Sequence, residues 1–163
     1  MAFDTFLKIT GVEGEAMQAN HAKEIEIYSF SWGASNPTTV GSGTGGLSAG
    51  KAEVSRFNIM KKSDKASPVL FQACCNGKHF PDAVVTLNKA SGEGGQAPFL
   101  KYTFTDVMIE SVQWSGSTGG DDTPTESVSL AFAKVEIEYQ QQDAKGAVGK
   151  PVLASWDLQK ITK

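Results

Sequence analysis

Four segments of the sequence alternate apolar and polar residues, and in each of them the apolar positions change parity partway along. In residues 24–32, Ile25 and Ile27 are apolar at odd positions, whereas Phe30 and Trp32 are apolar at even positions. Side chains of a strand point alternately to its two faces, so a strand with one buried face cannot make this change. The segment therefore contains a bulge, or it buries different faces at different points along its length. The same change of parity follows Val54, Phe104 and Phe132.

Repeated changes of the buried face indicate strongly bent strands in a small closed or nearly closed barrel. They are equally expected where strands bury a second surface at a subunit interface, and the sequence leaves both explanations open. The polar, glycine-rich residues 116–124 separate two long alternating segments and predict a hairpin. Further strands are predicted at residues 3–9, 53–60, 83–89 and 152–158. The predicted fold class is mainly β, a small β-barrel of two sheets with bent strands and one short α-helix packed alongside.

The predicted helix covers residues 67–76. Ser67 precedes Pro68, which suits an N-cap followed by a proline in the first helical turn, and Gly77 stands where a left-handed residue closes a helix. A helix of about ten residues is marginal alone in water, so we expect it to pack on the sheet. Its expected apolar face consists of Leu70, Phe71, Ala73, Cys74 and Cys75.

Composition excludes several classes of function. The chain of 163 residues shows no internal repeat and no linker, which predicts a single domain over residues 1–163. No apolar run approaches the ~20 residues of a membrane span, and residues 1–10 lack the features of a signal peptide, so we expect synthesis and folding in the cytoplasm. The net charge is −3 and Arg56 is the sole arginine, so no nucleic-acid partner is expected. The adjacent cysteines are expected to be small core residues rather than a disulfide or metal pair.

Residues 36–50 are rich in Gly, Ser and Thr and show no periodicity, which is typical of a long functional loop. Parts of this segment match the sequence motifs of a dinucleotide-binding site and of a nucleophile elbow, and another part nearly matches a P-loop. Each of these motifs needs a helix directly after it, whereas residues 53–60 predict a strand. The two histidines, His21 and His79, lack a second ligand at metal spacing, and His79 is expected to be hydrogen-bonded at the boundary of an element. We therefore expect no enzyme activity, no cofactor and no metal.

Several short stretches, in a fixed order along the chain, together match the pattern of a known family. They are residues 3–9 (FDTFLKI), 21–27 (HAKEIEI), 32–33, 64–68 (DKASP), 77–80 (GKHF) and 125–132 (TESVSLAF), with Cys74, Tyr139 and Trp156. In this order and spacing the chain resembles the Hcp family, the haemolysin-coregulated proteins that form the inner tube of type VI secretion systems.

The resemblance implies a barrel-like fold with one helix beside it and a structural role without enzymatic activity. It also implies hexameric rings that stack into a tube, a VgrG-type spike at the tip, and a contractile sheath that expels the tube. Members of the family carry small effector proteins in the ring lumen, and they leave the cell through the apparatus without a signal peptide.

If rings form, each subunit must present two different faces to its neighbours. We expect the long loop and the 116–124 turn to make ring or tube contacts, through Pro37, Thr38, Thr39, Val40, Gly46, Leu47, Gly119, Gly120, Asp121 and Asp122. Ser29 and Ser31 alternate with Phe30 and Trp32, and their side chains are the candidates for facing the lumen and its effectors. The alternative function is a ligand-binding β-barrel for a small apolar molecule or a glycan.

Overall fold

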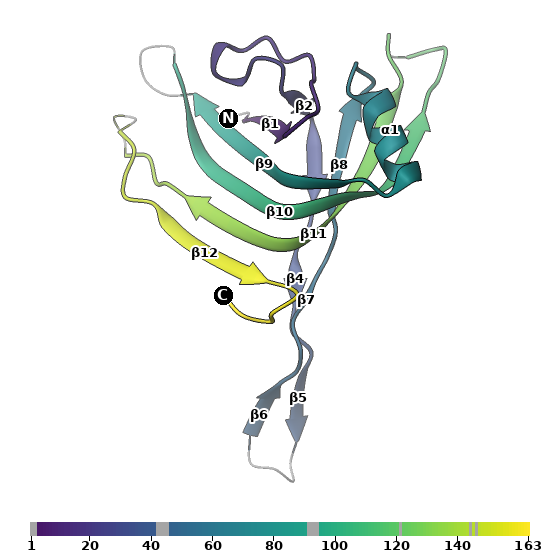
Figure 1. Cartoon of the computed structure of the whole chain (residues 1–163). Helices are drawn as coiled ribbons and strands as arrows, with labels where there is room; N and C mark the ends of the chain where they lie inside the picture. Colours follow the sequence, from purple (N-terminus) through teal and green to yellow (C-terminus); the bar gives the residue numbers. More distant parts are fainter. Residues whose placement is uncertain (1–2, 42–45, 91–94, 121, 144, 146) are drawn as a thin grey trace.

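The computed structural model describes residues 3–41, 46–90, 95–120, 122–143, 145 and 147–163. One α-helix, one short 3-10 helix and twelve strands make up the described elements (Figure 1). They are β1 (Asp4–Ile9), η1 (Ala19–His21), β2 (Ile25–Ile27), β3 (Ser29–Ser31), β4 (Ala34–Ser35), β5 (Thr38–Gly41), β6 (Gly46–Ala49), β7 (Glu53–Val54), β8 (Phe57–Lys62), α1 (Ser67–Asn76), β9 (His79–Ala90), β10 (Gln96–Ser115), β11 (Thr125–Tyr139) and β12 (Val152–Asp157). Within these ranges, no helix has both the length and the apolar character that crossing a membrane requires.

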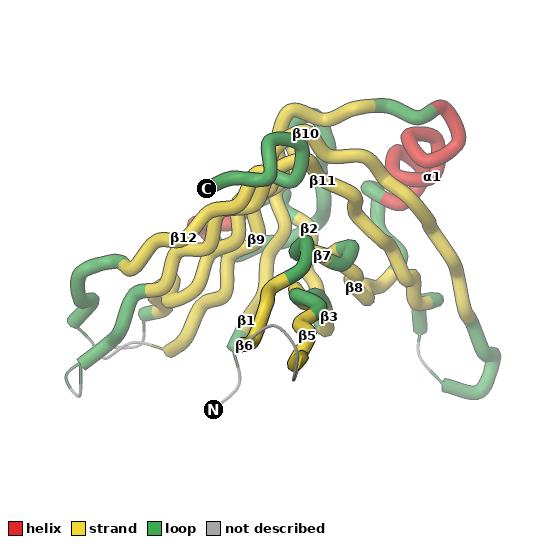
Figure 2. The backbone as a smooth tube through the Cα atoms, turned by 90° about the horizontal axis from the view of Figure 1, so that it is seen from below, coloured by secondary structure: helices red, strands yellow, loops and turns green. Residues whose placement is uncertain are grey.

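Eight strands form one bent sheet in the order β2-β1-β9-β10-β11-β8-β3, with β12 paired to the other half of β11. The two strands at the ends of this order, β2 and β3, are consecutive in the chain and separated only by Tyr28. The backbone N–H of Tyr28 donates to the carbonyl of Met60 on β8 (3.1 Å). One stretch of chain thus supplies both edges of the sheet and nearly closes it into a barrel, which confirms the predicted fold class. Figure 2 shows the arched sheet from below, with α1 at the opposite end from β12.

Near Asp106 the change of buried parity comes from bending rather than from a slip of register. The register of β10 shifts elsewhere, against β11 between Ile109 and Ser111 and against β9 between Pro98 and Leu100. Phe104 and Val107 are both fully buried although they lie three residues apart on β10. Asp106, between them, has a positive φ of 54°, while the pairing register with β9 and β11 is the same before and after it. The buried residues of the neighbouring strands change parity at the same level, from Ala83 to Phe80 and from Val135 to Phe132.

Aromatic side chains fill the space inside the bent sheet. The ring centroids of Phe57 and Phe104 are 4.9 Å apart, those of Phe104 and Phe132 are 4.5 Å apart, and Trp32 packs edge-on against Tyr102 at 5.1 Å. Phe57 and Phe104 are completely buried. Large rings in edge-to-face and tilted contacts stabilise a core beyond the area they bury. The interior of the barrel is therefore packed with side chains.

The helix has the predicted extent, but its first turn differs from the prediction. Ala66, not Ser67, is the N-cap residue, and its N–H donates to the carboxylate of Asp64 (3.0 Å). The hydroxyl of Ser67 accepts from the N–H of Asp64 (3.0 Å) and contacts the buried carboxylate of Glu126. The Ser67 hydroxyl, which was expected to cap the helix, thus contacts Glu126, a residue distant in the sequence. At the other end Gly77 adopts the left-handed conformation (φ 67°, ψ 31°), as predicted.

The buried face of α1 is narrower than predicted. Leu70 and Ala73 are buried and Cys74 is half-buried against the core. Phe71 and Cys75 were expected to widen this face, but both are exposed. A ten-residue helix on a sheet presents one stripe to it, and these two side chains lie off that stripe.

Candidate assembly surfaces

Residues 34–41 and 46–54, here called the arm, form a two-stranded ribbon that extends away from the barrel (Figure 1). The prediction of an irregular loop over residues 36–50 is therefore wrong for the described part of this range, because β5 and β6 pair there. The hydroxyls of Thr39 and Ser48 hydrogen-bond across the ribbon (2.5 Å), and the N–H of Gly50 donates to the carbonyl of Pro37 (2.7 Å). A Cβ on Gly50 would stand 2.7 Å from that carbonyl oxygen, so this close crossing requires glycine.

The predicted contact residues of the arm all lie on its surface. Val40 and Leu47 pair across the ribbon with 84% and 72% of their surfaces exposed. Every residue of β5 and β6 is exposed. A lone two-stranded hairpin is at best marginally stable in water, so an apolar pair on its tip favours a partner surface. Residues 42–45, which include Gly43 of the fingerprint-like motif, lie outside the described residues, and the ribbon leads into strand β7 rather than into a helix.

The second predicted contact region, residues 116–124, joins β10 to β11 as the expected hairpin, with Ser115 paired to Thr125. Gly119, Gly120 and Asp122 are exposed there, whereas Asp121 lies outside the described residues. In Figure 1 this turn lies at the upper right and the arm points down, so the structure does not bring the two regions together.

Ser29 and Ser31 are exposed on β3, and Phe30 between them packs inward against Phe57 (5.6 Å between ring centroids). The expected alternation of serine outside and aromatic inside is therefore present. Both serines lie on the strand that closes the barrel.

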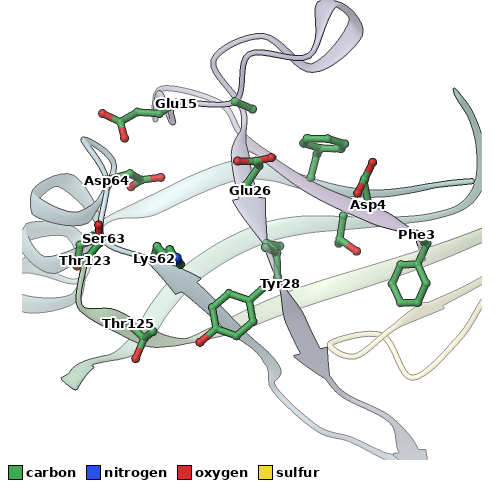
Figure 3. A pocket seen from close by; sticks show the side chains of 14 residues that line it. Phe3, Asp4, Glu15, Glu26, Tyr28, Lys62, Ser63, Asp64, Thr123 and Thr125 are labelled. Atoms are coloured by element: carbon green, nitrogen blue, oxygen red, sulfur yellow. The ribbon is translucent and has the colours of Figure 1, made fainter. Parts of the chain in front are cut away.

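A hollow of about 970 Å³ opens at the end of the barrel nearest α1 and the N-terminal strands (Figure 3). Its wall carries the carboxylates of Asp4, Glu26 and Asp64 and the amine of Lys62, beside the ring of Tyr28. Carboxylates outnumber amines in this wall, so the hollow favours positively charged groups. In the described part of the chain no three His, Cys, Asp or Glu side chains gather where they could hold a metal ion.

His79 is the first residue of β9, and its Nδ1 lies 2.8 Å from the carboxylate of Asp106. Both side chains are exposed. This confirms the expectation of a hydrogen-bonded histidine at the boundary of an element.

Sequence reasoning missed a buried ion pair between Lys61 on β8 and Glu126 on β11 (2.8 Å). A signal for it exists in the sequence. Lys61 continues the alternation of Phe57 and Ile59, and Glu126 precedes Val128 with the same period. Both charged residues stand at buried parity, where an unpaired charge would be costly.

The comparisons with known proteins agree with this geometry. The family model described as "Type VI secretion system effector, Hcp" matches residues 6–139. Protein hcp1 of Pseudomonas aeruginosa is 43% identical over 159 residues, which covers 97% of this chain and 96% of that protein. A solved type six secretion system protein superposes with a TM-score of 0.93 at 38% identity, covering 99% of both chains. Hcp1 of Salmonella typhimurium superposes with a TM-score of 0.82 at 36% identity, again over 99% of both chains.

The family match extends over most of the chain, and the likeness holds in sequence and in fold alike. It confirms the resemblance drawn from the sequence. The family consists of secreted type VI secretion proteins and not of enzymes. This chain belongs to the Hcp family of type VI secretion system proteins.

Proposed function

We propose that this chain is a subunit of the inner tube of a type VI secretion system, in which hexameric rings stack and are expelled. The observation that carries the proposal is the similarity to Hcp proteins along almost the whole chain. The chain acts as a single domain over residues 1–163, without a cofactor.

The arm and the 116–124 turn supply contacts to neighbouring subunits or rings. A ring closes through heterologous contacts, in which one face of each subunit meets a different face of the next. The exposed pair of Val40 and Leu47 gives the arm an apolar surface for such a contact. Pro37, Thr38, Thr39 and Gly46 flank that pair on the arm, and Gly119, Gly120, Asp121 and Asp122 form the second contact.

Ser29 and Ser31 face the lumen of the ring, where small effector proteins are carried. The other partners of the tube are a VgrG-type spike and a contractile sheath. The chain resides in the cytoplasm before firing, and is then delivered outside the cell or into a target cell. Nucleic acid and membrane insertion have no part in this cycle.

The test is the mass of the protein in solution by light scattering, followed by negative-stain microscopy of the same sample. Six-fold rings, alone or in stacks, are the expected result. A compact monomer at high concentration would contradict the tube function and leave the fold unchanged.

A ligand-binding barrel is the second candidate, and the open hollow beside Tyr28 is the observation that favours it. The packed aromatic interior counts against it, because such barrels keep a cavity inside. This candidate predicts a monomer or dimer that binds a small molecule, so the same light-scattering measurement separates the two functions.

A further inference from the structure

The side chain of His21 is held on three sides where residues 11–24 meet the sheet. Its Nδ1 lies 2.8 Å from the carboxylate of Glu24, and its ring stacks on Phe6 of β1 with centroids 4.4 Å apart and planes 3° apart. Its Nε2 lies 2.9 Å from the side-chain nitrogen of Asn88 on β9. Only 12% of the His21 side chain is exposed. The ring therefore connects residues of the loop to two strands of the barrel.

These contacts fit one neutral tautomer of the ring. The Asn88 amide donates to Nε2, so Nε2 offers a lone pair and the proton lies on Nδ1, which donates to Glu24. The other end of the same amide, Oδ1 of Asn88, is buried without a hydrogen-bond partner. A buried polar atom without a partner is costly, and it is rare in native structures.

A second proton on His21 would reverse this arrangement. Nε2 would become a donor and would face the amide N–H groups of Asn88. A half-turn of the amide would bring the unpartnered Oδ1 onto Nε2–H. Both ring nitrogens would then donate, one to the Glu24 carboxylate and one to the Asn88 oxygen, with the face of Phe6 against the cation.

We propose that His21 and Asn88 form a proton-operated latch, in which proton uptake from solvent at Nε2 turns the Asn88 amide and tightens residues 11–24 on the barrel. Hydrogen bonds that involve an ionised partner are about twice as strong as neutral ones, so the protonated latch holds the loop more firmly.

Glu24 is the charged group that contacts the ring among the described residues. Around Phe6, on which the ring stacks, the charged residues are Asp4 and Lys8 on β1 and Glu26, the cross-strand partner of Phe6 on β2. Asp4 accepts from Gln96 of β10 (2.5 Å), and Gln96 in turn bonds Gln18 of the loop. On β9 the neighbouring Lys89 is occupied over the ring of Phe99 (4.3 Å).

The latch adjoins the hollow at the barrel end. Glu15 and Ala16 of the loop line that hollow, and so does Phe6, on which His21 stacks. Within the loop, backbone bonds run from Gly14 N–H to the Lys23 carbonyl (2.8 Å) and from Ala16 N–H to the Glu24 carbonyl (3.0 Å). Outside it, Gln18 bonds Gln96 and Glu13 pairs with Lys65 (3.2 Å). Proton uptake at His21 thus changes how rigidly one wall of the hollow is held.

The experiment is an NMR titration of the full chain labelled with 15N, following the His21 ring nitrogens and the Asn88 side-chain amide together. We expect the Asn88 amide signals to shift with the same midpoint as the conversion of His21 Nε2 from acceptor to donor. We also expect hydrogen exchange at Gly14 and Ala16, corrected for its intrinsic pH dependence, to slow as His21 gains its proton.

The two histidines provide a matched pair of variants. His21→Gln should abolish the pH response of Asn88 and of the loop amides, whereas His79→Gln, which removes the exposed histidine, should leave both responses intact. An Asn88 amide whose signals stay constant while His21 titrates in the unmodified chain would overturn the proposal. So would a response that is lost in His79→Gln.

Discussion

Lys61 and Glu126 form an ion pair with no solvent exposure on either side chain. The amine of Lys61 also lies 2.9 Å from the Asp64 carboxylate and 3.1 Å from the hydroxyl of Ser67. One cation thus connects β8, β11 and the first turn of α1. Taking two charges out of water costs nearly as much as their attraction returns, but removing one partner leaves the other charge buried alone.

We predict that Lys61→Ala lowers the free energy of unfolding by about 3–5 kcal/mol, because Glu126 is left as an uncompensated buried charge. Urea unfolding at neutral pH measures this loss. Lys65→Ala is the matched control, since Lys65 pairs with Glu13 (3.2 Å) at the surface, where such pairs contribute about 0–1 kcal/mol.

Replacing both partners tests the cause. The double variant Lys61→Met with Glu126→Leu should be more stable than Lys61→Ala alone, because it removes the fully buried carboxylate of Glu126, and the Asp64 carboxylate that remains keeps some contact with solvent. A double variant that is less stable than the single one would show that the pair itself, and not the orphaned carboxylate, sets the cost.

At the scale of elements, the arm should contribute to assembly but little to the stability of the single chain. We predict that Val40→Ser with Leu47→Ser changes the free energy of unfolding by less than about 0.5 kcal/mol per site, because both side chains are exposed in the single chain. The same variant should lose rings or stacks in light scattering and microscopy, because it removes the apolar contact of the arm.

Met17→Ser is the control for the arm variant, since Met17 is 94% exposed on residues 11–24 and lies outside the proposed contacts. It should assemble as the unmodified chain does. Normal rings and stacks from the arm variant would exclude Val40 and Leu47 from the interface.

The turn after β12 depends on Asp157. Hydrogen bonding from the backbone N–H of Lys160 (2.9 Å) lowers the pKa of this carboxyl below its usual value, against an opposing contribution of desolvation, and the N–H of Gln159 (3.0 Å) adds to the lowering. A carboxyl whose pKa is lower in the folded state stabilises above its unfolded pKa, and that stabilisation is lost as the pH falls through the folded pKa.

We therefore predict that Asp157→Ala destabilises the chain slightly at neutral pH, and that the difference from the unmodified chain shrinks on acidification below the usual pKa of an aspartate. Chemical unfolding across a pH series measures it. Asp157→Asn keeps an acceptor oxygen but does not titrate, so unmodified and Asn chains should converge at low pH. A difference between Asp and Ala chains that grows with acidity would contradict the prediction.

Local signals predicted the local structure well. Pro68 and Gly77 marked a helix over residues 67–76, and the parity changes marked the bent strands. The N-cap prediction failed because the Ser67 hydroxyl contacts Glu126, which comes from a distant strand. The sequence did not predict the pairing of β5 with β6, because these strands lack alternating apolar residues. Hydrogen bonds between hydroxyl and backbone groups, such as that of the Gly50 N–H, hold the arm together instead.

The candidate surfaces were predictable as exposed segments, since glycine-rich and polar stretches lie outside the core. The closure of the barrel at Tyr28 and the contact of His21 with Asn88 were not, because both join residues far apart in the sequence. Only the pairing of the strands brings such residues together.

At the scale of the whole molecule, the proposed ring gives the exposed side of β3 a function. We predict that Ser31→Gln leaves ring formation intact, because Ser31 is exposed, and weakens retention of small effectors, because a longer side chain narrows the lumen. Co-purification of an effector with assembled rings measures the effect. Ser55→Gln, on an exposed residue after β7, is the comparison variant, and unchanged retention by Ser31→Gln would exclude Ser31 from the lumen wall.

The closure of the barrel also determines which strands resist a pulling force applied to the arm. The arm leaves the barrel through β3 and returns through β8, and these two strands pair with each other at one end of the sheet order. A pull on the arm along its axis is therefore carried lengthwise by β8 against β11, whose hydrogen bonds run across the strands. Such bonds are loaded in shear and must break together instead of opening one by one. The base of the arm is thus anchored in strands whose hydrogen bonds together resist a lengthwise pull.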